Sequence, residues 1–289
     1  MKKGVALLIT IGFVAVLTAL IAYIFSLTNV VFDKVDNLHK RDQSSVIFSD
    51  VKKILDSYAG DIENSNDFST FLLGVPPFYE SSSGLGLDVK MSPLSDKINI
   101  NSILTGKKPD KNIVHFLQNI CETYNILDAS FFISLVLDTI DKDTLERQAL
   151  SEISLHDLKY SNGRIYSKKQ FETLEKYYAD VVQDKNIFSV PWDRFVYFGG
   201  KNSGIVDCDR MSKEMIYILG LDSENFTGCD DLKDKESKKI ATKYNLKKFS
   251  KENNYYILVK IFYQINSIKD RASFIYDIKT KRASNFELF

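Results

Sequence analysis

The chain opens with Met-Lys-Lys-Gly, which leads directly into the most apolar segment of the sequence. Residues 5–32 carry no charged side chain, and about 20 predominantly apolar residues are enough to span a bilayer as a helix. We therefore expect a membrane-spanning helix over about residues 5–28. Lys2 and Lys3 precede this segment and Asp33 follows it, a charge bias that places the N-terminus in the cytoplasm and the bulk of the chain outside.

Beyond the apolar segment, the hydrophobic positions become spaced by three and four residues, which is typical of an amphipathic helix. We expect one helix over residues 5–58, roughly 80 Å long at 1.5 Å per residue. Its first half would lie in lipid, and its second half would pack on a soluble head. The apolar positions of that second half are Val31, Val35, Leu38, Ile47, Val51, Ile54, Leu55 and Tyr58.

The rest of the chain reads as strands, then helices, then strands. The pair Pro76 and Pro77, together with residues 80–86, predicts a loop. The aromatic and β-branched character of the C-terminal residues predicts an antiparallel meander with turns at residues 267–271 and 279–282. The expected early strands are residues 87–91 and 97–100, the expected helices are 111–127, 129–140, 168–182 and 212–219, and the expected late strands are 255–264, 272–278 and 283–289.

These elements predict an α+β fold in which a long N-terminal helix packs on an antiparallel β-sheet. A helical insertion of about 150 residues, near the usual size of a domain, separates the early strands from the late ones. The expected divisions are a leader over residues 1–4, the N-terminal helix over 5–58, the first part of the β head over 59–101, the inserted helical domain over 102–250, and the C-terminal strands over 251–289.

Gly4, which lies between the basic pair and the apolar run, changes the interpretation of the N-terminus. An ordinary secretory signal has a shorter apolar core and a small-x-small cleavage site, which residues 20–22 do not supply. A short basic leader that ends in Gly before an apolar helix resembles the prepilin signal of type IV pilins and type II secretion pseudopilins. The resemblance implies a pilin-like fold, cleavage by prepilin peptidase between Gly4 and Val5, and methylation of the new N-terminus.

Ile9 departs from the pattern of most such proteins, which carry Glu at the fifth position of the mature chain. A carboxylate in an apolar helix bundle is costly unless it is paired, and in the family its usual partner is the N-terminal amine of the next subunit outward. A subunit with nothing above it has no such partner to offer. The uncharged Ile9 therefore resembles the tip-type position of the type II secretion minor pseudopilin K.

Three further segments resemble the K family in their order along the chain. Residues 95–101 resemble its Asn-x-Asn segment, and residues 137–143 resemble a helix end in which Thr139 replaces the usual Trp. Residues 197–209 resemble its second Asn-x-Asn segment, with Asp at both Asn positions. A strand end followed by a helix cap is also sufficient to explain the two Asn-x-Asn-like patterns.

Two acidic groups have the oxygen-only chemistry that suits calcium, an ion that the resemblance to K-type pseudopilins also implies. The first group lacks EF-hand spacing, and a solvated, capped helix end is its favoured interpretation; the second group could bind an ion equally well. The choice between the two groups stays open. The first is Asp138, Asp141, Asp143 and Glu146, and the second is Asp222, Glu224, Asp230 and Asp231.

The three cysteines do not fit a zinc site or a disulfide-rich scaffold. In an oxidising exterior, Cys208 and Cys229 could form a disulfide. Cys121 falls on an apolar helical face, which predicts a buried free thiol.

No catalytic site is evident in the sequence. The three histidines, His39, His115 and His156, show no metal or triad spacing, and Gly84-x-Gly86 lacks the context of a nucleotide loop. Formal net charge is zero, with 38 basic and 38 acidic side chains, so no global field favours nucleic acid. The lysines between Lys233 and Lys248 are interpreted as a solvated face.

The sequence therefore predicts a non-enzymatic minor pseudopilin resembling protein K, located at the tip of an inner-membrane pseudopilus, where it helps to initiate or cap the fibre for protein export. The implied partners are the I-type and J-type minor pseudopilins, the major pseudopilin, prepilin peptidase and the inner-membrane secretion platform. The implied location is the bacterial inner membrane, with one span and a periplasmic C-terminal domain. Two alternatives are a minor subunit of a type IV pilus or DNA-uptake machine, and a signal-anchored extracytoplasmic binding or hydrolytic domain.

Overall fold

The computed structural model describes residues 42–80, 85–106, 108–200, 204–265 and 268–288. The predicted leader and membrane helix, with Gly4, Val5 and Ile9, lie outside these residues. The chain divides into two compact units, residues 1–54 and residues 55–289. Within the described ranges, no helix combines the length and the apolar character needed to cross a membrane.

The described part of the first unit, residues 42–54, is helical, and the helix continues into the second unit as far as residue 58. This end coincides with the predicted one. In the second unit the last turns of the helix attach to the sheet, because the Tyr276 hydroxyl donates a 2.8 Å hydrogen bond to Asp56 Oδ1. Lys281 Nζ also donates to the backbone carbonyl of Asp56, at 2.7 Å.

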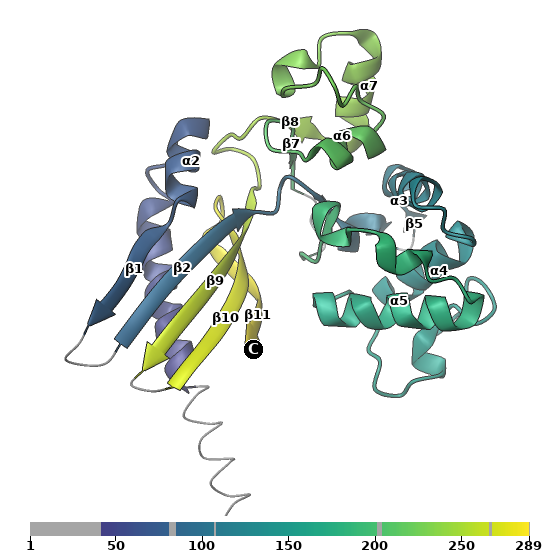
Figure 1. The fold of residues 1–289 in the computed structure, drawn as a ribbon, viewed down its shortest axis with the longest axis horizontal. Coiled ribbons are helices and arrows are strands. Elements are labelled where there is room, and N and C mark those ends of the chain that lie inside the picture. Colours follow the sequence, from purple (N-terminus) through teal and green to yellow (C-terminus); the bar gives the residue numbers. More distant parts are fainter. Residues whose placement is uncertain (1–41, 81–84, 107, 201–203, 266–267, 289) are drawn as a thin grey trace, which may run out of the picture. The chain divides into compact units, whose positions relative to one another are not determined.

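The second unit contains a five-stranded sheet in the order β1-β2-β9-β10-β11 (Figure 1). Every neighbouring pair is antiparallel. Successive side chains of a strand point to opposite faces of the sheet. In the central strand β9, the alternate residues Ile257, Val259 and Ile261 are apolar and fully buried, so they form one face of the strand that packs in the core. The strands are β1 (Val75–Glu80), β2 (Leu85–Pro93), β9 (Tyr256–Ile265), β10 (Ile268–Asp277) and β11 (Arg282–Leu288).

Two predictions about the sheet were wrong. Pro76 and Pro77 lie in strand β1, where the sequence predicts a loop; β1 is an edge strand, with a register irregularity between Val75 and Phe78, and such strands tolerate proline. The turn predicted over residues 267–271 is shorter, because β10 already begins at Ile268 and pairs there with Ile265.

Helix α2 (Ser65–Leu72) was not predicted. Asn64 and Asp67 form a reciprocal capping box at its start, which is a sequence signature of a helix N-terminus. Its one buried side chain, Phe68, stacks on Phe249 with ring centroids 4.6 Å apart and meets Tyr255 edge-on at 4.5 Å. A single buried residue gives too little periodicity to reveal so short a helix.

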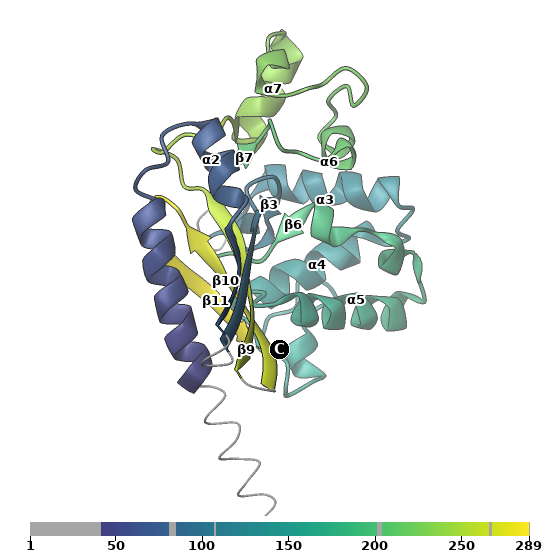
Figure 2. The same ribbon diagram turned by 60° about the vertical axis from the view of Figure 1, so that its left-hand side comes forward.

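The chain between β2 and β9 forms the helical region, whose elements are seen from two sides in Figures 1 and 2. The predicted ranges 129–140 and 168–182 coincide with α4 and α5, and the predicted 111–127 is too long, since Asn125 adopts a left-handed φ of 54° just after α3. Helix α7 was missed because lysines surround its few apolar positions. The helices are α3 (Lys111–Thr123), α4 (Ala129–Ile140), α5 (Lys168–Val182), α6 (Lys213–Ile218) and α7 (Lys235–Tyr244).

Two short parallel strand pairs lie within the helical region. Strand β3 (Ile98–Asn99) pairs with β6 (Val196–Tyr197), and β7 (Val206–Asp207) pairs with β8 (Leu246–Lys247). One buried apolar core extends through the region from Ile98 to Leu246. Segments distant in sequence therefore meet in a common core.

The two ends of the helical region meet at the sheet beside Ser95. The Ser95 hydroxyl accepts a 3.0 Å hydrogen bond from the backbone N–H of Tyr256, and the Ser95 carbonyl accepts one from the N–H of Asp207. Leu94 N–H donates to the Tyr256 carbonyl at 2.9 Å. The sheet and the helical region thus share a hydrogen-bonded junction inside one compact unit.

Candidate functional site

The first Asn-x-Asn segment forms a buried amide clamp. Asn101 Oδ1 accepts a 2.8 Å hydrogen bond from the N–H of Ile165, and Asn101 Nδ2 donates to the carbonyls of Ile165 and Gly199, both at 2.8 Å. Asn99 Oδ1 accepts from the N–H groups of Asn101 and Gly199. Both asparagines are fully buried, so these contacts satisfy backbone groups that water cannot reach.

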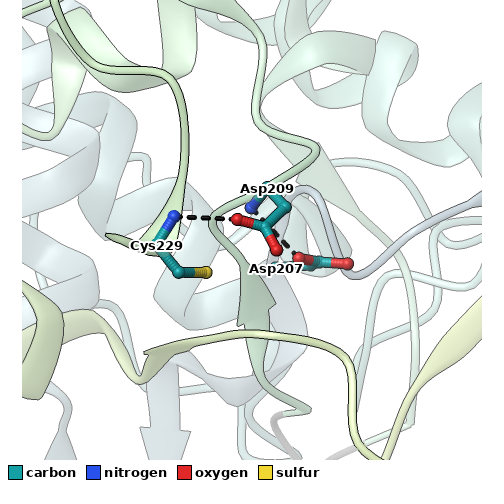
Figure 3. Close-up of side chains that lie close together, drawn as sticks. All are labelled: Asp207, Asp209 and Cys229. Carbon is teal, nitrogen blue, oxygen red and sulfur yellow. Dashed lines mark hydrogen bonds between the residues drawn. The ribbon is translucent and has the colours of Figure 1, made fainter. Parts of the chain in front are cut away.

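The second segment repeats this arrangement with aspartates (Figure 3). Asp207 Oδ1 accepts a 3.1 Å hydrogen bond from the N–H of Asp209, and Asp209 Oδ1 accepts one of 2.8 Å from the N–H of Cys229. The structure also brings Cys208 and Cys229 together in a disulfide, with sulfurs 1.93 Å apart. In both Asn-x-Asn-like segments, therefore, the first side chain accepts from the backbone N–H two residues later and the last side chain accepts from a distant backbone N–H.

Asp207, Asp209 and Cys229 are the one group of at least three potential metal ligands found among the described residues, with ligand atoms within 4.8 Å of one another. The Cys229 sulfur is bonded to Cys208 and is not a thiolate. Arg210 already brings a positive charge, since its Nε lies 3.4 Å from Asp207 Oδ2. Only two carboxylates are left for a cation, which is a poor fit to the six to eight oxygens that calcium takes.

Asp207 is buried and is stabilised from two sides. Burial raises the pKa of its carboxyl group, and this effect is opposed by a 2.8 Å hydrogen bond from the Tyr255 hydroxyl. Arg210, which pairs with Asp207, also stacks on α2, with its guanidinium 4.9 Å from the ring centroid of Phe68. The cluster joins α2, β7 and the start of β9, which favours a structural role.

The predicted calcium group around Asp138 is organised by Arg147, a residue that the sequence analysis missed. Arg147 Nη1 contacts Asp138 Oδ1 and Asp141 Oδ2, and Arg147 N–H donates to Asp138 Oδ2 at 3.0 Å. Asp138 is completely buried and also accepts from the Ser151 hydroxyl. Burial raises the pKa of Asp141, although Arg147 opposes the shift. The guanidinium supplies the positive charge that these two carboxylates need.

The other predicted ligands have partners of their own. Asp143 Oδ1 accepts from Leu145 N–H at 3.2 Å, and Glu146 Oε1 accepts from Leu150 N–H at 3.1 Å. In the second acidic group, Asp222 caps a turn through Asn225 Nδ2 at 2.7 Å, and Asp230 pairs with Lys248 at 2.7 Å. Calcium binding by either group stays a prediction.

Cys121 is a buried free thiol, as its place on an apolar helical face predicts. Burial raises the pKa of this thiol to about 12, so the nucleophilic thiolate is not populated near neutral pH. His156 Nε2 lies 3.7 Å from Glu146 Oε1 in a largely exposed loop.

The sheet is antiparallel, and the helical region is inserted between its adjacent strands β2 and β9. The fold is similar to that of a chain in the crystal structure of the GspK–GspI–GspJ complex from the enterotoxigenic Escherichia coli type 2 secretion system. The TM-score is 0.53 at 13% sequence identity, and the match covers 87% of this chain and 96% of that chain. No protein-family model matches the chain, and no curated protein matches it. The likeness therefore supports a minor-pseudopilin fold of the GspK type.

Proposed function

We propose that this chain is a minor pseudopilin of a type II secretion system that sits at the tip of the pseudopilus and helps to initiate or cap the fibre. The observation that carries the proposal is the fold likeness, which extends over 87% of the chain and so includes both the sheet and the helical region. The prepilin-like leader ending at Gly4 supports it independently. The role is one of assembly and not of catalysis.

The proposed partners are other minor pseudopilins of the I and J types, because the structurally similar chain comes from a GspK–GspI–GspJ complex. The major pseudopilin, prepilin peptidase and the inner-membrane secretion platform complete the proposed set. The proposed location is the inner membrane, with the N-terminus cytoplasmic and the head periplasmic, as the charge bias around residues 5–28 indicates.

Deletion of the gene tests the assignment. We expect loss of exported proteins from the culture medium, retention of the same proteins in the periplasm, and recovery by the full chain expressed in trans. Transformation frequency is measured in the same strains. Loss of DNA uptake with normal protein export would instead indicate that the chain is a minor subunit of a DNA-uptake machine.

Processing separates a pseudopilin from a signal-anchored domain. We expect mass spectrometry of the full chain from peptidase-competent cells to find Val5 as the first residue, and Gly4→Val to leave the leader attached. An intact leader on the unsubstituted chain would favour the signal anchor.

The tip location rests on Ile9. In the outermost subunit, Ile9→Glu would place a carboxylate without its amine partner in an apolar bundle, at a cost of several kcal/mol unless it is protonated. We expect fewer fibres and weaker export. Ile9→Leu is the matched control, and unchanged export with Ile9→Glu would argue against the tip.

A further inference from the structure

A cleft of about 630 Å³ lies between helix α5 and strands β9 and β10. This volume is in the range of sites that hold ligands. The walls are mostly apolar and come from segments far apart in the sequence. The side chains that matter for the argument are Phe171, Trp192 and Phe198 on the helical side, and Leu258 and Ile275 on the sheet side.

Among the described residues that line this cleft, two buried polar atoms make no hydrogen bond, and one buried carboxyl group has no ion-pair partner. Trp192 is 6% exposed, and its indole N–H makes no hydrogen bond; the same is true of the buried Oδ1 of Asn285. Glu175 is 8% exposed, and no cation among the described residues lies within ion-pair distance of it. The indole N–H of Trp192 lies close enough to the Glu175 carboxyl to oppose the rise in its pKa, although the two groups do not reach hydrogen-bond geometry, and burial dominates and raises that pKa to about 7.

The unpaired groups define the chemistry of an occupant. The indole N–H of Trp192 lacks a well-placed acceptor and Asn285 Oδ1 lacks a donor, while the Glu175 carboxyl beside the indole can accept a hydrogen bond or, when protonated, donate one. A backbone amide supplies both kinds of group at short spacing, and apolar side chains on either side of it match the walls. We propose that this cleft binds an extended, apolar peptide segment of another protein chain.

Two other occupants fit less well. An acyl chain matches the apolar walls but leaves the indole N–H of Trp192 and Asn285 Oδ1 unpaired, and unpaired buried groups are unfavourable. An organic cation would suit Glu175 but would meet Lys168 and Lys169, which line the same cleft. A peptide satisfies the walls and the polar groups together, and this inference does not depend on the secretion assignment.

The chain itself provides the reporter, because Trp192 is its single tryptophan. The full chain is reconstituted in phosphatidylethanolamine and phosphatidylglycerol vesicles and titrated with acetyl-Leu-Phe-Leu-amide while its tryptophan emission is recorded. We expect a saturable change in emission, and no saturable change with decanoate, which is apolar but lacks an amide. Saturation by decanoate alone would identify an acyl site and overturn the proposal, as would the absence of saturation by the peptide.

Substitutions at Glu175 and Asn285 test whether these polar groups bind the peptide. Glu175→Leu and Asn285→Leu should each weaken peptide binding by tenfold or more, and Glu175→Gln, which keeps a hydrogen-bonding group, should bind nearly as well as the unsubstituted chain. Asp180→Asn, an exposed acid on α5 that does not line the cleft, is the matched control and should change nothing. Circular dichroism verifies folding of each variant. Unchanged affinity in folded Glu175→Leu and Asn285→Leu would overturn the proposal.

Discussion

Asn101 and Asp209 occupy equivalent positions, each two residues after the end of a short strand, β3 for Asn101 and β7 for Asp209. Each accepts a 2.8 Å hydrogen bond from a backbone N–H farther along the chain, that of Ile165 for Asn101 and that of Cys229 for Asp209. Each side chain therefore fixes a connecting segment against a short parallel strand pair. The helical region depends on these two long-range attachments as well as on its apolar core.

Asn101→Ala should strongly destabilise the protein. The substitution leaves the N–H of Ile165 and the carbonyl of Gly199 buried without the Asn101 side chain, at roughly 1–3 kcal/mol for each unpaired group. We expect a loss of about 3 kcal/mol in the free energy of unfolding, measured by chemical denaturation. Asn66→Ala, at an exposed position, is the control and should stay within about 0.5 kcal/mol. Equal effects of the two substitutions would contradict this role for Asn101.

Removing the disulfide should lower thermal stability. Cys208 and Cys229 are separated by 21 positions, and closing a loop of that size stabilises a fold by about 3 kcal/mol in the chain-entropy account. The double variant Cys208→Ser and Cys229→Ser should melt roughly 6–12 °C lower in calorimetry. A reductant should lower the melting temperature of the unsubstituted chain and leave that of the variant unchanged. If the reductant shifts neither, the disulfide is absent in solution.

Arg147→Met should be far more damaging than a substitution in an exposed ion pair. It leaves the carboxylate of Asp138 buried without its cation, and breaking a buried pair in this way costs about 3–5 kcal/mol. Arg194→Met is the matched control, because its pair with Glu214 is exposed and should contribute less than about 1 kcal/mol. Urea denaturation of both variants checks the difference, and similar losses would show that Asp138 does not need the guanidinium.

Calcium binding can be tested with the same substitution. If calcium binds the group formed by Asp138, Asp141, Asp143 and Glu146, it competes with the Arg147 guanidinium for the first two carboxylates. Arg147→Met should then bind calcium more tightly than the unsubstituted chain in titration calorimetry, and calcium should restore part of its lost stability. The absence of calcium-dependent heat in both proteins would leave Arg147 as the permanent cation of the group.

The contribution of Glu175 to the stability of the protein should decrease as the pH rises. Burial raises the pKa of this carboxyl from 4.5 to about 7, so between these values the folded chain binds more protons than the unfolded chain. Stability from this group is therefore present below pH 4.5 and is lost as the pH rises through 7. Glu175→Gln should be more stable than the unsubstituted chain at pH 8, by up to roughly 3 kcal/mol, and similar to it at pH 4.5. Denaturation across this range measures the effect, and Asp180→Asn, at an exposed position on α5, should leave the pH dependence of stability as it is in the unsubstituted chain.

The sequence predicts the elements whose signal is local and periodic. Helices α4 and α5 have wide apolar stripes, and their observed bounds match the predicted ones. Helix α7 escaped prediction because its lysines obscure Ile240, Ala241 and Tyr244, and strand β1 escaped because proline usually indicates a loop. Strand β9 was recognisable from its aromatic and β-branched residues.

The sites were less predictable, because their partners are set by long-range packing. Nothing near Asn101 in the sequence indicates Ile165, and nothing near Asp138 singles out Arg147 among neighbouring charges. The cleft around Trp192 and Glu175 combines α5, a short turn and the C-terminal strands. An isolated Trp and a Glu that falls within an apolar helical stripe are the only local signals for it.

The insertion of the whole helical region between β2 and β9 has a consequence for folding order. These two strands are direct neighbours, with Pro93 opposite Ile257, although residues 94–255 separate them along the chain. In an unfolded chain, closing so long a loop carries an entropic cost that grows with its length. Prior folding of the helical region brings its two ends together at Ser95 and removes most of that cost. The meander β9-β10-β11 needs only short turns, so β2 and β1 should join the sheet last, and their pairing should be the slow step of refolding.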